Sequence, residues 1–145
     1  MISMKMNNWR KRSWKTLANI ANGCFSKKSG EVNLQKKMEA HKRPANCPMM
    51  IVSTVNKEIW SQLPQAVCPT DLRAMHIQCA MTKAATAVVE LVNEILPHPR
   101  MQECVCKGTG MIRLLGHASH VMPLCRHSSL KPFVNKTVTH MCGEV

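Results

Sequence analysis

The sequence contains no tyrosine and few other aromatic residues, with two Phe and three Trp among 145 residues. Aromatic side chains give the largest apolar burial per residue, so their scarcity excludes a large aromatic core. Methionine is abundant instead, with twelve residues, and 45% of the chain is hydrophobic. Methionine is flexible and specifies packing poorly. We therefore expect a helical, loosely specified core of Met, Val, Leu, Ala and Cys that is marginally stable alone and gains stability by self-association.

Long apolar runs are also missing. No stretch approaches the ~18 consecutive apolar residues of a membrane-spanning helix. The first 28 residues lack the continuous apolar block of a signal peptide. We therefore expect an intracellular protein, cytoplasmic or nuclear, without a membrane partner. In that reducing setting most of the eight cysteines are predicted to be free thiols that pack as small apolar groups.

Acidic residues are scarce, with eight Asp and Glu against 20 Lys and Arg. None of the acids form the paired set that general acid–base catalysis or hard cations require. With eight Cys and seven His, a Cys/His pair arises by chance, and none has the context of a known nucleophile. Gly108 and Gly110 lack the strand and the lysine of a phosphate-binding loop. We predict no enzymatic activity, no cofactor and no small-molecule substrate.

The positive charge is concentrated at the start of the chain. Residues 1–43 carry eleven bases and two acids, a net charge of +9, and residues 44–145 carry a net charge of +3. A basic arm before a nearly neutral body is typical of proteins that bind polyanions, because phosphate contacts release counterions. The alternative is that the charge serves solubility alone. The predicted nucleic-acid-binding residues are Arg10, Lys11, Arg12, Lys15, Lys27, Lys28, Lys36, Lys37, Lys42 and Arg43.

Two tryptophans lie among the first of these bases. Trp9 and Trp14 flank Arg10, Lys11 and Arg12. Indole faces can stack on unpaired bases while the cations neutralise phosphates, which favours a single-stranded nucleic acid. Packing of both tryptophans against a neighbouring helix is an equally good interpretation.

Apolar spacing predicts several helices. Residues 9–25 form a short amphipathic helix that ends at Gly23 or soon after, and residues 31–41 form a second, weaker one. Prolines then interrupt the chain, and residues 49–55 are predicted to be extended. Residues 56–63 form a turn or short helix closed by a proline.

The clearest element is a long helix over about 70–96. Thr70 is predicted to cap it, with Asp71 in the first turn, where the helix dipole favours an acid. Pro97 ends it. Its apolar positions recur every three or four residues and are Ile77, Met81, Ala84, Ala85, Val88, Leu91, Val92 and Ile95. This stripe is predicted to be either a core face or a seam for self-association.

Glycines surround a further helical stretch at residues 111–115, and an irregular Cys/His-rich tail is expected after it. The tail region offers the only combination of thiols and imidazoles that suits zinc. Its spacing is poor, because structural sites place two to four residues between paired cysteines. We therefore predict no metal site at Cys104, Cys106, His117, His120, Cys125 and His127.

The fold class predicted from these elements is all-α. Residues 1–43 are expected to form short basic helices or a partly disordered arm. Residues 44–145 are expected to form a small helical domain built on the one long helix.

Several stretches, in order over about residues 17–140, resemble the uncharacterised Gag-like open reading frame of DIRS-type tyrosine-recombinase retrotransposons. They are Leu17-Ala18-Asn19-Ile20, Arg43-Pro44-Ala45-Asn46-Cys47, Val55-Asn56-Lys57-Glu58-Ile59-Trp60-Ser61-Gln62-Leu63, Thr70-Asp71-Leu72-Arg73 with Gln78, and Leu114-Leu115-Gly116-His117-Ala118-Ser119-His120. The chain departs from the family at Cys125-Arg126-His127, where the family is more uniformly basic. It also stops soon after Cys142, as a truncated copy would.

The resemblance implies a helical, RNA-associated structural protein of a retroelement and carries over no catalytic residue. It further implies that Ile59, Trp60 and Leu63 pack a short helix against the long one, and that Gly116 allows close backbone approach or a tight turn. The predicted function is a Gag-like protein that binds nucleic acid, chiefly single-stranded RNA, and self-associates through the long helix. The alternatives are a non-enzymatic protein-interaction scaffold and a small zinc-binding module.

Overall fold

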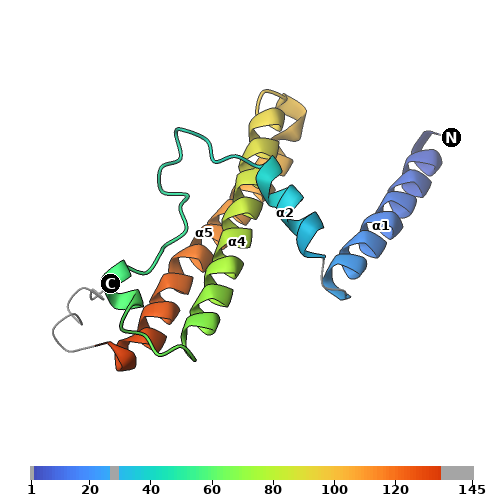
Figure 1. The fold of residues 1–145 in the computed structure, drawn as a ribbon. Helices are drawn as coiled ribbons and strands as arrows, with labels where there is room; N and C mark the ends of the chain where they lie inside the picture. Colours follow the sequence, from blue (N-terminus) through green and yellow to red (C-terminus); the bar gives the residue numbers. More distant parts are fainter. Residues whose placement is uncertain (1, 27–29, 135–145) are drawn as a thin grey trace. The chain divides into compact units, whose positions relative to one another are not determined.

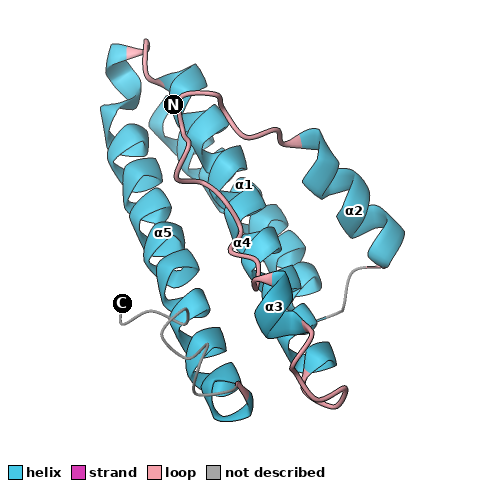
Figure 2. Ribbon diagram, turned by 60° about the vertical axis from the view of Figure 1, so that its left-hand side comes forward, coloured by secondary structure: helices cyan, strands magenta, loops and turns pink. Residues whose placement is uncertain are grey.

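The computed structural model describes the backbone of residues 2–26 and 30–134 and the side chains of residues 13–26 and 30–134. All regular elements in this part of the chain are helices, which confirms the all-α prediction (Figure 1, Figure 2). The chain divides into two compact units, Met1–Ala40 and His41–Val145, close to the boundary expected after residue 43. No helix in the described ranges is both long enough and apolar enough to cross a bilayer.

The first unit contains α1 (Ile2–Ser26) and α2 (Glu31–Ala40). Helix α1 is longer than the predicted 9–25, and Gly23 lies inside it. Helix α2 begins where the Leu34 amide donates to the Gly30 carbonyl, 3.0 Å away, with Glu31 in the first turn. Every side chain from residue 14 to residue 26 is exposed. The unit therefore presents helix surface rather than a core of its own.

The second unit is built on an antiparallel helical hairpin. Helices α4 (Cys68–Ile95) and α5 (Gln102–Leu130) lie side by side in both views and are joined through η1 (Pro99–Met101) (Figure 1, Figure 2). Helix α4 confirms the predicted long helix. It begins at Cys68, before Thr70, because a proline fits the first helical turn, where no amide donor is needed. The predicted capping role of Thr70 is therefore wrong.

Helix α5 runs without a break from Gln102 to Leu130, although it contains three glycines and Pro123. The predicted short helix at residues 111–115 and the irregular tail after it are wrong as far as residue 130. Residues 135–145, the end of that expected tail, lie outside the described part. Intrinsic propensity disfavours glycine and proline inside a helix, but packing along α4 outweighs it.

A close approach between the two helices occurs at Gly108. Gly108 is buried, and a Cβ atom at this position would overlap the side chain of Val92 on α4. Only glycine fits this spacing. Gly116, for which the family resemblance implied such a role, lies mid-helix with nothing within 4 Å of a built Cβ. That expectation is wrong, because Gly116 is on an exposed side of α5.

Residues 41–56 form an irregular segment that follows the hairpin to α3 (Lys57–Trp60). The Lys83 ammonium donates to the His41 carbonyl at 2.7 Å, and the His41 ring lies 2.7 Å from Glu90. The predicted extended stretch 49–55 is irregular and forms no strand. Helix α3 begins as predicted near Asn56, whose side chain accepts from the Glu58 amide.

The apolar core lies at the open end of the hairpin. Ile59 and Leu63 pack there with Leu130 and Val134, which lie at and beyond the end of α5. Partly buried side chains complete the cluster, and these are Val55, Trp60, Val67 and Cys68. The short helix therefore packs at the start of α4, as the resemblance implied, and also against the end of α5.

The face that α4 turns toward α5 overlaps the predicted apolar stripe only in part, at Ala85 and Val92. The buried positions are spaced by seven residues, at Asp71, Gln78 and Ala85, with Thr86 beside them. Ile77 and Leu91, predicted members of the stripe, are 53% and 56% exposed. The stripe is therefore not the core face at these positions, because α5 covers the row of residues next to it.

Candidate nucleic-acid interface and buried polar network

The predicted nucleic-acid-binding residues fall on both helices of the first unit and just after it. Arg10, Lys11, Arg12 and Lys15 lie in α1, and Lys36 and Lys37 lie in α2. Lys42 and Arg43 belong to the second unit and are exposed. Lys27 and Lys28 lie outside the described residues. The structure thus distributes the described basic positions over two helices and one loop.

Two cations of the hairpin, Lys107 and Arg126, are paired with carboxylates, whereas the lysines of the first unit whose side chains are described are not. In the hairpin, Lys107 donates to Glu103 at 2.6 Å, and this hydrogen bond and the carboxylate charge raise the pKa of Lys107. In contrast, Lys15, Lys36 and Lys37 are exposed and form no ion pair within the described ranges. Unpaired, solvated ammonium groups are free to neutralise phosphates.

Helix α1 also presents unpartnered apolar side chains. Trp14 is 69% exposed and Phe25 is 94% exposed. Leu17 and Ile20 are each 57% exposed. Within the described structure, Trp14 is not held in a packed core, so its indole face is accessible for stacking. The side chain of Trp9 lies outside the described side chains.

In and after α2, some polar groups are used locally. Gln35 donates to the Glu39 carboxylate at 2.7 Å, one helical turn further along the chain. The Arg43 guanidinium donates to the Pro48 carbonyl at 3.3 Å. Arg43 therefore holds the loop after the first unit while its side chain remains in solvent.

The cysteines and histidines considered for zinc all lie on α5. Since a helix rises ~1.5 Å per residue, positions 104 and 127 are about 35 Å apart, too far to share one ion. No three Cys, His, Asp or Glu side chains in the described part of the chain gather closely enough to hold a metal. The seven described cysteines are free thiols.

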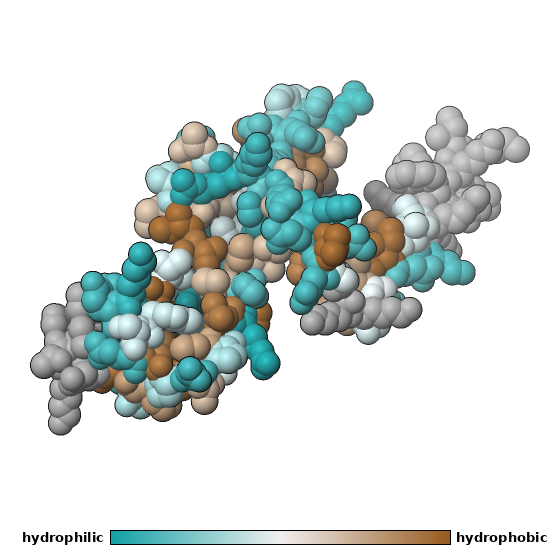
Figure 3. Space-filling model, in the orientation of Figure 1, coloured by the Kyte–Doolittle hydropathy of each residue, from teal (hydrophilic) through white to brown (hydrophobic). Residues whose placement is uncertain are grey.

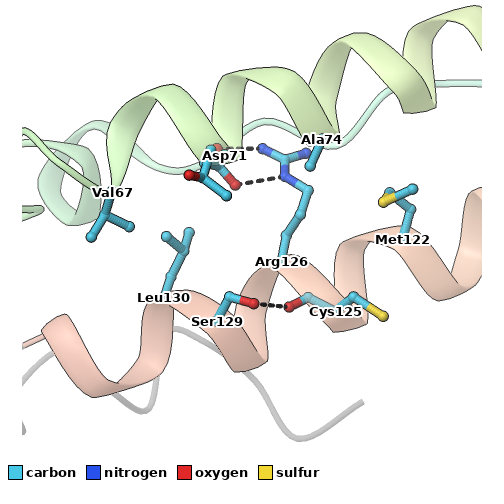
Figure 4. A pocket seen from close by; sticks show the side chains of 9 residues that line it. Val67, Asp71, Ala74, Met122, Cys125, Arg126, Ser129 and Leu130 are labelled. Carbon is cyan, nitrogen blue, oxygen red and sulfur yellow. Dashed lines mark hydrogen bonds and ion pairs between the residues drawn. The ribbon is translucent and has the colours of Figure 1, made fainter.

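A buried ion pair joins the two helices of the hairpin. The Arg126 guanidinium donates from Nε and Nη2 to the two carboxylate oxygens of Asp71, at 2.7 and 2.8 Å (Figure 4). Both residues are 5% exposed. Nη1 of Arg126 also donates to the Ser53 carbonyl at 2.6 Å and to Gln78 Oε1 at 3.3 Å. One guanidinium thus ties α5 to α4 and to the segment before α3.

Gln78 extends this network to a carbonyl that Pro123 leaves free. In an α-helix the amide of residue 123 would bond the carbonyl of residue 119, but proline has no N–H. The Gln78 amide donates to the Ser119 carbonyl at 3.3 Å across the hairpin. Gln78 is 1% exposed, so an unmet hydrogen bond there would be costly. We call Asp71, Gln78 and Arg126 the polar seam.

The polar seam was not predicted from the sequence. From the sequence, Asp71 is expected in the first helical turn, where the dipole favours an acid, and Arg126 stands out only as part of a departure from the family pattern. A signal was present, since Asp71, Gln78, Ala85 and Val92 are each seven residues apart. That spacing places them on one helix face, but it does not name the cation on the facing helix.

A small cavity of about 110 Å³ adjoins the polar seam, lined by side chains from α4 and α5 (Figure 4). Its lining is mainly apolar and includes Val67, Met122 and Leu130. The Asp71 and Arg126 groups at its wall already bond each other. Ligand pockets for small molecules are larger, at roughly 300–1,000 Å³. The cavity is therefore a packing defect beside the network rather than a substrate site.

Together these features define an all-helical protein whose first unit carries exposed cations and whose second unit is a hairpin closed by a polar seam. The chain belongs to the family described as Domain of unknown function (DUF8747), whose model matches residues 13–145. The match takes in most of α1 and the whole described hairpin. No curated protein and no solved structure matches the chain.

Proposed function

We propose that this protein is a non-enzymatic, Gag-like structural protein that binds nucleic acid through its basic first unit and self-associates through α4. Single-stranded RNA is the proposed ligand, in an intracellular setting. The observation that carries the proposal is the exposed, unpaired Lys15 beside the exposed Trp14 on α1, together with the exposed, unpaired Lys36 and Lys37 of α2. The family resemblance of the sequence motifs supports the retroelement assignment.

Electrostatics favours the first unit as the binding part. Residues 1–40 carry nine bases and two acids, a net charge of +7. Residues 41–145 carry eleven bases and six acids, a net charge of +5 over a longer stretch of chain, so positive charge is denser in the first unit. Cations neutralise phosphates without reading sequence, whereas the indole gives a stacking surface that unpaired bases can use.

The test is binding of the full-length chain to a labelled oligouridylate, followed by fluorescence anisotropy at several salt concentrations. Replacing Arg10, Lys11, Arg12 and Lys15 by Gln removes four charges from α1. We expect weaker binding. The slope of log affinity against log salt concentration should become less steep by about 0.7 for each contacting charge that is lost. Trp14→Leu should weaken binding at least about fivefold, as ~1 kcal/mol of stacking requires.

Two control variants are matched to these substitutions. One removes four positive charges from the second unit, and the other replaces a different exposed aromatic side chain. Lys57, Arg100, Arg113 and Lys131 are exposed residues of the second unit, and replacing all four by Gln should change affinity much less. Phe25→Leu is the control for Trp14→Leu, since Phe25 is also exposed on α1. Equal losses from both charge sets would mean that net charge alone drives binding, and the proposal would fail.

A protein-interaction scaffold is the second candidate, favoured by the exposed Leu17, Ile20 and Phe25 of α1. The two functions differ in salt dependence. Phosphate binding weakens steeply as ionic strength rises, whereas apolar docking does not. Absence of oligouridylate binding at about 50 mM salt would favour the scaffold.

A further inference from the structure

One face of α4 is apolar from Ile77 to Leu91 and has no partner in the hairpin. Ile77, Ala84 and Leu91 are exposed and spaced by seven residues. Met81 and Val88, four residues after the first two, are only partly buried. Together these five residues form the seam pattern of a coiled coil, with apolar positions alternating four and three apart. We call them the outer face, since α5 packs on the neighbouring row that contains Gln78 and Ala85.

Small residues and two opposite charges border the outer face. Arg73, Ala80, Ala87 and Glu94 follow each other at intervals of seven residues, so they form one row along the helix. Arg73 and Glu94 are exposed, and neither forms an ion pair within the described residues. They are about 31 Å apart at ~1.5 Å per residue, so they cannot pair within one helix.

This charge arrangement is complementary to itself when the helix is reversed. In an antiparallel pair related by a twofold axis between residues 83 and 84, Arg73 of each copy lies beside Glu94 of the other. The same axis brings Ala80 beside Ala87 of the second copy, and alanine pairs permit close helix approach. In a parallel pair like charges would meet at both ends, which is unfavourable.

We propose that the outer face of α4 binds the outer face of a second copy of this chain in the antiparallel orientation. This inference rests on the self-association in the proposed function and gives it a surface and a direction. Twofold contacts use the same patch on both subunits, so they require a self-complementary patch. The outer face meets that condition because its centre is apolar and uncharged, with Arg73 at one end and Glu94 at the other. The hairpin surface drawn in Figure 3 is a mixture of apolar (brown) and polar (teal) patches, so apolar surface remains accessible to solvent on the folded unit.

Sedimentation velocity of the full-length chain without nucleic acid tests the proposal over a concentration series. We expect a monomer–dimer equilibrium in the parent. Ala84→Glu places two carboxylates near the twofold axis and should weaken the dimer roughly tenfold or more. Because Ala84 is exposed and Glu is a good helix former, the hairpin should stay folded by circular dichroism. Asn93→Glu adds the same charge to the opposite side of α4 and should leave the dimer intact.

Charge exchange tests the orientation. Arg73→Glu and Glu94→Arg should each weaken the dimer by about tenfold, since each replaces two attractions by two repulsions. The double variant Arg73→Glu/Glu94→Arg should restore it. An equal mixture of the two single variants should form a heterodimer with both attractions intact. A parallel dimer would show no loss in the single variants and no rescue in the double.

The outcomes separate this inference from the proposed function. A parent that stays monomeric at every concentration overturns the inference and the proposed self-association, while RNA binding is judged by the anisotropy experiment. A dimer that Ala84→Glu does not weaken leaves self-association standing but overturns the outer face as its site. If α1 of the same chain covered the outer face, the protein would stay monomeric and the charge variants would not change its sedimentation. That result would also overturn the inference.

Discussion

Toward the open end of the hairpin, the buried Arg126 makes four hydrogen bonds, two to the Asp71 carboxylate and one each to Gln78 and the Ser53 carbonyl. All the donors of a buried guanidinium need partners, and a lysine could supply neither the planar fork nor the number of donors. A single residue thus connects three segments that are far apart in the sequence. The placement of α5 against α4 depends on this side chain as well as on apolar packing.

Removing only one partner of the buried ion pair should be strongly destabilising. Arg126→Leu leaves the Asp71 carboxylate buried without a counter-charge, so we expect the free energy of unfolding to fall by about 3–5 kcal/mol. Asp71→Leu alone should have a similar effect. The double variant Asp71→Leu/Arg126→Leu should recover much of the loss, because no unpaired charge remains. Urea unfolding followed by circular dichroism measures all three, and purely additive losses would contradict the role assigned to the pair.

The bond from Gln78 to the Ser119 carbonyl makes a second residue-scale prediction. Gln78→Leu should cost about 1–3 kcal/mol, since a buried carbonyl and the Arg126 donor lose a partner. Pro123→Ala supplies the amide that α5 lacks for that carbonyl. In the Pro123→Ala background the cost of Gln78→Leu should therefore be smaller. A double-mutant cycle by urea unfolding tests this, and a coupling energy of zero would show that Gln78 does not compensate for Pro123.

At the scale of elements, α5 combines good packing with poor intrinsic propensity. Its glycines differ in surroundings, because a Cβ at Gly108 meets Val92, while Gly110 and Gly116 have open space around them. Glycine inside a helix costs roughly 1 kcal/mol relative to alanine. The chain therefore loses helix stability at three positions but needs glycine for packing at only one of them.

Alanine substitutions should separate these glycines. Gly110→Ala and Gly116→Ala should each raise the free energy of unfolding by about 0.5–1 kcal/mol. Gly108→Ala should be less favourable than these by about 1–3 kcal/mol, because the added methyl group overpacks against Val92. Adding Val92→Ala to Gly108→Ala should relieve part of that strain. Thermal unfolding reports the differences, and three equal effects would mean that the helices are not in close contact at Gly108.

The sequence predicted the elements better than it predicted their contacts. The long helix was found because its apolar period, Asp71 in the first turn and Pro97 all agree, although the capping role given to Thr70 was wrong. Helix α5 was missed because Gly110, Gly116 and Pro123 signal breaks, and the packing that overrides them comes from a distant segment. The polar seam was missed for the same reason, since Asp71 becomes a buried partner only when Arg126 faces it. The predicted basic residues remain a prediction. The structure places Lys15, Lys36 and Lys37 on exposed helix surfaces.

On the scale of the whole molecule, stability is concentrated in one part of the second unit. The apolar cluster around Ile59 and Leu130 and the polar seam both lie toward the open end of the hairpin. Helix α1 has no buried side chain from residue 14 onward, and an isolated helix is marginal in water. The exposed basic helices and the stabilising core therefore belong to different units. Substitutions for binding can be made in α1 with little effect on the fold.

Amide hydrogen exchange should show this division as a gradient of protection along the chain. Backbone amides of α1 should exchange first, because their hydrogen bonds break without the loss of buried contacts. Amides near Asp71 on α4 and Arg126 on α5 should exchange last, at rates set by unfolding of the hairpin.

A substitution in the apolar cluster tests whether the hairpin unfolds as one unit. Ile59→Ala should lower the free energy of unfolding by about 2–5 kcal/mol because of the cavity it leaves. The amides of α4 and α5 should then exchange faster, by the same factor in both helices. Leu17→Ala on α1, where the side chain is exposed, is the matched control and should leave the hairpin protection unchanged. If α1 proved as protected as the hairpin at low protein concentration without nucleic acid, its apolar side chains would have to be buried, which would contradict the exposure of α1 on which this prediction rests.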